Sequence, residues 1–251
     1  VVPSAFTRGR CGMIDFENNI VTGTTIGDTW RQALWLCYKN GFEYEINSAK
    51  NGQEFGSYIG QKRIQLPFFM GRIKMPWVRP LSPIMPPNYP PPTDDDKIAD
   101  YFAEYLMNPV LKPNELYRYS SWVAPQVDTM IRHLIDSNGK TNQATISVGD
   151  TTCADMQDPP CLRLISFKAI DGTLRTSVFF RSWDLVAGFP ENLGGIQLLK
   201  EYVLEFVNDG LKEKGVEPLR DAELFTYSDG LHIYDHYIDV IKSLMPEERE
   251  D

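Results

Sequence analysis

Apolar residues recur at helical spacing in several stretches of the chain. Between Asp28 and Asn40 they are one, three or four positions apart, and Gly41 follows, so this pattern predicts a helix that ends there. A second helix should open at Asp94–Asp96, where acidic residues suit the helix dipole, and end before Asn108-Pro109. Further helices are predicted over Pro125–Asp136, over Leu193–Val207, and around Ile238, Val240, Ile241 and Leu244.

Short apolar runs between these helices predict strands. Asp171-Gly172, a sequence typical of a tight hairpin turn, should join two of them, and Asp229-Gly230 should form a second turn. Helices that precede and cover a run of strands predict an α/β class with one mixed sheet. The predicted strands are Ile64–Val78, Ala144–Val148, Leu162–Ala169, Leu174–Phe180, Leu224–Tyr227 and His232–Tyr234.

The domain organisation follows from the segments without such periodicity. Eight prolines between Pro76 and Pro92 predict an extended loop over 76–93, because proline fixes φ and lacks an amide donor. Residues 47–61 are polar and predict another loop. We expect a single domain over 1–251, with 1–20 and 246–251 peripheral to it.

Length and charge exclude several classes of protein. A chain of 251 residues can bury a large core without disulfides or metal. No apolar run reaches membrane-span length, and the first residues lack a signal-peptide core, so we expect a cytoplasmic protein with no membrane partner. The net charge of −9 argues against general nucleic-acid binding. A basic island in this acidic chain fits either a small anionic ligand or solvated strand charges; it comprises Lys62, Arg63, Arg72, Lys74 and Arg79.

The four cysteines contain no closely spaced pair, so we expect neither a structural metal nor a disulfide framework. Cys37 lies on the apolar stripe of the first helix and should fill the core. Cys161 differs, because it follows the stiff Asp158-Pro159-Pro160 segment and begins a predicted strand, a rigid place for a nucleophile. A lone cysteine is nevertheless more often structural than catalytic.

Arg181-Ser182-Trp183-Asp184 ends the second strand of the hairpin that Cys161 begins. If both lie at the open end of that hairpin, the Arg181 guanidinium could favour the thiolate and, with Ser182, bind a phosphate. The chain then continues with Gly188, Pro190 and Asn192, an apolar helix, and His232-Ile233-Tyr234.

In order, spacing and residue type, this combination resembles the thymidylate synthase family, most closely its short archaeal and phage-type members. The resemblance is clear from Asn142 to His236. It implies a thymidylate synthase-like sandwich whose sheets pack back to back in a homodimer. The implied activity is C5 methylation of dUMP to dTMP, with 5,10-methylenetetrahydrofolate or a methanopterin-type analogue as the one-carbon donor and no metal.

The resemblance also implies roles for individual residues. Cys161 would add to C6 of the base, Asn192 would contact its edge and favour uracil, and Glu104 and Tyr119 would assist catalysis, Glu104 by relaying protons. The implied ligand contacts are Arg181, Ser182 and Arg63 on the phosphate, His232 and Tyr234 on the sugar hydroxyl, and Asp184 and Gly188 on the pterin.

Three departures from the family pattern leave the activity open. Asn142-Gln143 replaces an arginine pair that the family donates across the dimer to the phosphate, Leu162 replaces a common histidine, and the sequence ends in Glu-Glu-Arg-Glu-Asp instead of an apolar tail. A wetter site could let water capture the one-carbon unit, so one alternative is a 5-hydroxymethylase of dUMP, dCMP or CMP. Another alternative is a nucleotide-binding homologue without catalysis.

Overall fold

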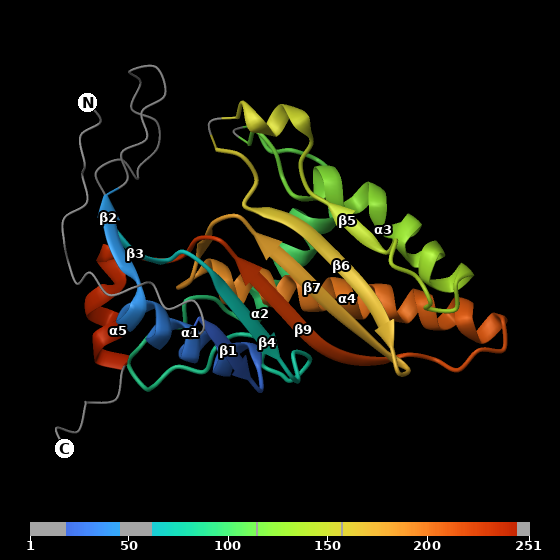
Figure 1. Ribbon diagram of the computed structural model, residues 1–251, viewed down its shortest axis with the longest axis horizontal. Coiled ribbons are helices and arrows are strands. Elements are labelled where there is room, and N and C mark those ends of the chain that lie inside the picture. Colours follow the sequence, from blue (N-terminus) through green and yellow to red (C-terminus); the bar gives the residue numbers. More distant parts are fainter. Residues whose placement is uncertain (1–18, 46–61, 114, 157, 245–251) are drawn as a thin grey trace.

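The computed structural model describes residues 19–45, 62–113, 115–156 and 158–244. The loop predicted over 47–61, most of the peripheral segments and Cys11 lie outside these ranges. Figure 1 shows an elongated molecule built on a long, twisted sheet with helices packed against it.

The larger of two sheets has six strands in the order β1-β4-β9-β7-β6-β5. The β1–β4 and β7–β9 pairs are parallel and the other pairs antiparallel, so the sheet is mixed as predicted. Asp171 and Gly172 join β6 to β7 with φ values of 51° and 67°, the left-handed geometry of a tight hairpin turn. The strands are β1 (Ile20–Gly23), β4 (Phe69–Ile73), β5 (Thr145–Ser147), β6 (Leu162–Ile170), β7 (Thr173–Phe180) and β9 (Arg220–Ser228).

A second, four-stranded sheet was not predicted. Its order is β2-β3-β10-β8, and it joins segments far apart in the chain: β2 (Phe42–Glu45), β3 (Lys62–Leu66), β8 (Trp183–Asp184) and β10 (Leu231–Tyr234). In the β3–β10 pair, Arg63 lies opposite Tyr234 and Gln65 opposite His232. This sheet therefore brings together residues whose proximity no local sequence pattern indicates.

The helices pack mainly on one side of the six-stranded sheet, where α3 and α4 run along it (Figure 1). Thr25 caps α1 by accepting the amide of Asp28, and Asp94 caps α2 by accepting that of Lys97. After α2 the helix widens into a π-helix over Tyr101–Met107. The α-helices are α1 (Ile26–Asn40), α2 (Asp95–Asp100), α3 (Ser120–Asp136), α4 (Gly188–Glu213) and α5 (Ile238–Leu244).

Several predicted boundaries are wrong. The strand predicted over Ile64–Val78 is two strands, because the chain turns after Leu66 and joins the other sheet. The helix predicted from Pro125 begins at Ser120, with Pro125 inside its second turn, and α4 exceeds Leu193–Val207 at both ends. The strands that flank Asp229-Gly230 enter different sheets, so these residues connect the sheets and do not close a hairpin.

Candidate active site

Cys161 lies directly before β6, at the end of the β6–β7 hairpin where β6 begins and β7 ends. Its carbonyl oxygen accepts the backbone amide of Arg181 at 2.9 Å, so the two residues are neighbours at the open end of the hairpin, as predicted. The amide of the following residue, Leu162, donates to the Tyr119 hydroxyl at 3.3 Å. These contacts fix the backbone on both sides of the thiol.

The Arg181 guanidinium ties down the segment that precedes Cys161. Its Nε donates to the Pro160 carbonyl at 3.1 Å, and its Nη2 donates to the Pro159 carbonyl and to the Asp158 carboxylate. Among the described residues, Nη1 donates no hydrogen bond, so that part of the guanidinium can bind an anion. Arg181 therefore has both a structural contact and an unused donor beside the thiol.

Opposing effects act on the Cys161 thiol. Burial raises its pKa most, Arg181 and Arg63 lower it, and Asp158 raises it. Two cations thus stabilise the thiolate that nucleophilic chemistry requires, against the cost of desolvation.

If the thiolate is the reactive form, kcat/KM should rise as pH rises through the pKa of Cys161. Arg63→Met removes a cation and should move this rise to higher pH, whereas Asp158→Asn removes an anion and should move it to lower pH. The shift from Asp158→Asn should be small, since the Asp158 side chain is 83% exposed and screened by solvent. Measuring kcat/KM against pH for both variants and for the unchanged protein checks this, and shifts in the same direction would contradict it.

Arg63 lies on β3 of the other sheet, close enough to Cys161 for their charges to interact. Burial lowers the pKa of the Arg63 guanidinium, and Tyr234, Cys161 and Arg181 all lie close enough to shift it. The sequence prediction that Arg63 joins the anion site is therefore consistent with its position. Arg72 and Arg79 of the basic island instead pair with Glu223 and Glu201.

His232 presents a neutral acceptor beside Arg63 and Tyr234. Its ring lies 4.9 Å from that of Tyr234 and is 3% exposed, and burial lowers its pKa to about 3. Because Nδ1 lies 2.9 Å from the Gly230 carbonyl, Nδ1 must carry the proton and Nε2 must be the acceptor. Nε2 is buried without a partner among the described residues, so it suits a hydroxyl donor of a ligand.

Four tyrosines lie close enough to the thiol that, besides burial, its charge raises the pKa of their hydroxyls. Tyr101 and Tyr105 come from the π-helix and stack with their ring centroids 5.5 Å apart, and Tyr105 packs edge-on against Tyr119. The charge of Cys161 acts on these three hydroxyls and on that of Tyr117. Only Tyr119 was predicted as a site residue; the four-residue spacing of Tyr101 and Tyr105 was the available signal for the others.

The predicted base and pterin residues lie along β8 and the start of α4. Asn192 accepts the indole N–H of Trp183 at 2.9 Å. The Asp184 carboxylate accepts the backbone amides of Val186, Ala187 and Gly188, which fixes it at the start of α4, and burial raises its pKa. Ser182 follows Arg181 and passes close to Gly230, on which a Cβ would lie 3.2 Å from the Arg181 carbonyl oxygen.

The structure does not bring Glu104 to the thiol. Its half-exposed carboxylate lies 3.6 Å from Arg118 Nη1 and accepts a hydrogen bond from Asn108. The charges that shift the pKa of Cys161 come from Arg181, Asp158 and Arg63. The proton-relay role of Glu104 stays a prediction without a contact that supports it.

The remaining cysteines and polar candidates lie elsewhere. Cys37 is fully buried and burial raises its pKa to about 12, which confirms that it fills the core. Cys153 is buried and accepts the Asp150 amide. Asn142 accepts a hydrogen bond from the Lys168 ammonium group.

Within the described ranges, no group of three or more histidine, cysteine or acidic residues could hold a metal ion, and no helix is long and apolar enough to cross a membrane.

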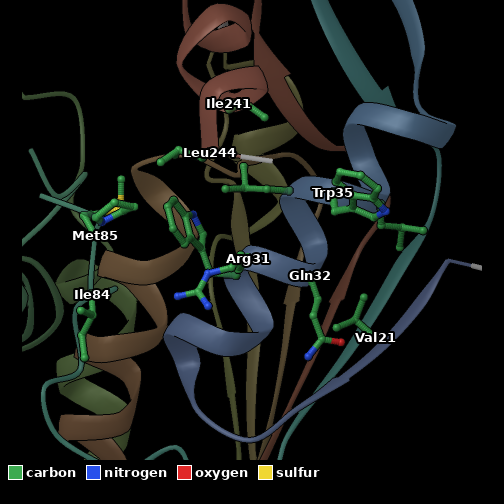
Figure 2. A pocket seen from close by; sticks show the side chains of 12 residues that line it. Val21, Arg31, Gln32, Trp35, Ile84, Met85, Ile241 and Leu244 are labelled. Carbon is green, nitrogen blue, oxygen red and sulfur yellow. The ribbon is translucent and has the colours of Figure 1, made fainter. Parts of the chain in front are cut away.

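A groove of about 990 Å³ lies apart from these residues, between α1, the proline-rich loop and α5 (Figure 2). Its walls are mainly apolar and include Trp35, Met85 and Leu244, with Arg31 and Gln32 at its polar points. None of the predicted site residues lines it.

Comparison with known proteins places the whole arrangement in one family. No family model matches the chain. A Methanosarcina barkeri protein named "Putative thymidylate synthase" is 31% identical over 235 residues, which cover 90% of this chain and 94% of that protein. A Methanopyrus kandleri protein of the same name is 23% identical over 225 residues, 86% of this chain and 93% of that one. Thymidylate synthase A of Bacillus subtilis has the same fold, with a TM-score of 0.60, 15% identity, and coverage of 88% of this chain and 84% of that one. The chain therefore belongs to the thymidylate synthase family of one-carbon transferases, as the pattern around Cys161, Arg181 and Asn192 indicated.

Proposed function

We propose that this protein methylates dUMP at C5 to give dTMP. The observation that carries the proposal is the position of Cys161 beside Arg181, whose backbone amide donates to the Cys161 carbonyl at 2.9 Å, with burial raising the pKa of the thiol and Arg181 and Arg63 both close enough to lower it. Addition of the thiolate to C6 turns the unreactive C5 of uracil into an enolate carbon that can attack a one-carbon electrophile. Loss of the C5 proton and release of the one-carbon carrier would leave an exocyclic methylene carbon. Hydride transfer to that carbon would give the methyl group, and Cys161 would leave C6 as the thiolate.

Each neighbouring group has a task in that reaction. Arg181 Nη1 and Arg63 would bind the phosphate, with Ser182 beside them. Arg63 would thereby compensate in part for the arginine pair that Asn142-Gln143 replaces. His232 Nε2 would accept a hydrogen bond from the sugar hydroxyl, and Tyr234, which lies next to His232, would contact the same hydroxyl. Tyr119 would position the backbone at Cys161.

A reduced pterin supplies the one-carbon unit and, for methylation, the hydride. Asp184 fits such a partner, because a buried carboxyl held by three backbone amides can meet the ring N–H groups of a pterin in a fixed direction. Gly188, where a Cβ would lie 3.4 Å from that of Asp184, lets the chain pass close to it.

Hydroxymethylation of a pyrimidine nucleotide is the second candidate, and one experiment separates the two. Tritium release from dUMP labelled at C5 is measured with and without methylenetetrahydrofolate while dihydrofolate absorbance is followed. Release with dihydrofolate supports methylation, and release without dihydrofolate supports hydroxymethylation. No release from dUMP would contradict both for this base and leave cytosine nucleotides or a non-catalytic protein.

We further propose that the protein is a homodimer that pairs the helix-free face of the six-stranded sheet (Figure 1). Side chains on this face alternate along each strand with the buried core residues. They include an aromatic pair, Phe179 and Tyr227, with ring centroids 5.0 Å apart, and Glu223 between Arg72 and Arg175. A face that combines an aromatic pair with its own ion pairs suits a second copy of the same chain.

Phe179→Asp should convert the dimer to a monomer, because it would bury a charge against Tyr227 in the paired face. Molar mass by light scattering checks this at micromolar protein. Phe206→Asp is the matched control, since Phe206 is 45% exposed on α4, away from the face, and should leave the mass unchanged. An unchanged mass for Phe179→Asp would contradict this mode of pairing.

A further inference from the structure

Trp183 is fixed in place beside the residue proposed to contact the base. Its side chain is 3% exposed, stacks on Phe180 with ring centroids 3.9 Å apart and an angle of 8°, and packs against Phe189 at 4.6 Å. Because Phe180 and Phe189 both pack against the indole, a change of its side-chain rotamer would cost these contacts. Its Nε1 donates to Asn192 Oδ1 at 2.9 Å.

This hydrogen bond determines which way the Asn192 amide faces. The two ends of an amide have nearly the same shape, but an indole N–H can only donate, so Oδ1 must be the end that meets Trp183. The NH₂ end therefore points away from Trp183. Among the described residues it donates no hydrogen bond, so two donors remain for a ligand, and Oδ1 keeps a second lone pair.

We propose that Trp183 is a positioning residue that selects the base by holding the Asn192 amide with its donors toward the ligand. A pyrimidine with a carbonyl oxygen at C4, as in uracil, accepts from such a donor. A pyrimidine with an amino group at C4, as in cytosine, would place donor against donor. This inference rests on the proposed function, specifically on Asn192 contacting the base.

The test compares dUMP and dCMP binding to the intact protein by titration calorimetry. Trp183→Phe keeps an aromatic ring against Phe180 but removes the N–H. Without that bond the amide can turn over, so dUMP affinity should fall about tenfold while dCMP affinity does not fall, and the preference for dUMP should narrow accordingly. Trp183→Tyr, which also lacks the indole donor, is the second variant should the first fail to fold.

Trp30→Phe is the matched control. Trp30 is also 3% exposed and also donates its indole N–H, but to the Leu185 and Val186 carbonyls at 2.9 and 3.2 Å and not to Asn192. Both substitutions should lower the melting temperature, and only the Trp183 variants should change the dUMP-to-dCMP ratio.

The outcomes are distinct. An unchanged ratio in a folded Trp183 variant, or an equal narrowing in Trp30→Phe, would overturn this inference and leave the proposed function standing. An unchanged protein that binds neither nucleotide would overturn the proposed function and this inference together.

Discussion

Cys161→Ala is expected to lower turnover by about 10⁴-fold or more, because no other group can add to C6 of the base once the sulfur is removed. Nucleotide binding should survive, since the proposed phosphate and sugar contacts come from Arg181, Arg63 and His232. Tritium release measures turnover, and titration calorimetry with dUMP measures binding. The pairing of lost turnover with retained binding is what identifies a nucleophile.

The control for this prediction is Cys153→Ala, which removes a different buried cysteine. Cys153 lies in a short 3₁₀ turn and accepts the Asp150 amide, so its loss should affect stability more than turnover. Retained turnover in Cys161→Ala would reject the nucleophile assignment and with it both proposed reactions.

Arg181→Met should reduce kcat/KM for dUMP by about 10²-fold or more. A hydrogen bond to a charged group contributes about 1.5–3 kcal/mol, so losing the phosphate contact alone raises KM by about 10- to 150-fold. Loss of the cation also raises the pKa of the Cys161 thiol, because Arg181 is the largest of the effects that lower it. Fewer molecules then carry the thiolate at neutral pH, and kcat should fall as well.

Arg181 also holds the Pro159 and Pro160 carbonyls, so damage to that loop must be separated from loss of the phosphate contact. Comparing dUMP with deoxyuridine does this, because a phosphate ligand improves binding of the nucleotide only. The variant should lose most of the preference for dUMP over deoxyuridine and keep only the part due to Arg63, whereas a variant that merely disturbs the loop would keep the full preference for dUMP. Arg132→Met, which removes an exposed arginine on α3, should leave both affinities unchanged.

Local chemistry explains which parts of the fold the sequence could predict. The β6–β7 hairpin follows from Asp171-Gly172 and from alternation along both strands, and a hairpin of that length is enough to put Cys161 beside Arg181. The four-stranded sheet is built from short strands far apart in the chain, and β8 has two residues, which leaves no periodic signal. Side-chain direction was equally hidden: nothing in the spacing of Glu104 showed that it faces Arg118.

In the candidate site, too, local sequence predicted some features and long-range pairing set the others. Arg63 was proposed from its place in the basic island and from the family resemblance, and its position opposite Tyr234 depends on the β3–β10 pairing. The sequence indicated no role for Trp183 within Arg181-Ser182-Trp183-Asp184, and only its stacking on Phe180 and its hydrogen bond to Asn192 indicate one. Residue type thus predicted the chemistry of the site, while long-range strand pairing decided which side chains lie together in it.

The β3–β10 pairing also bears on how the protein is made. Arg63 and Tyr234 are separated by 171 positions (234 minus 63), yet they sit opposite each other in one small sheet. At synthesis rates of about 5–20 residues per second, β3 emerges on the order of ten seconds before β10, its later neighbour in the sheet, has been synthesised. During that interval the backbone groups of β3 that later pair with β10 have no partner. Such an unpaired strand edge favours capture by a chaperone or pairing with another nascent chain. Ribosome-bound chains halted before residue 231 should therefore lack an anion site, even where the Cys161 hairpin has already closed.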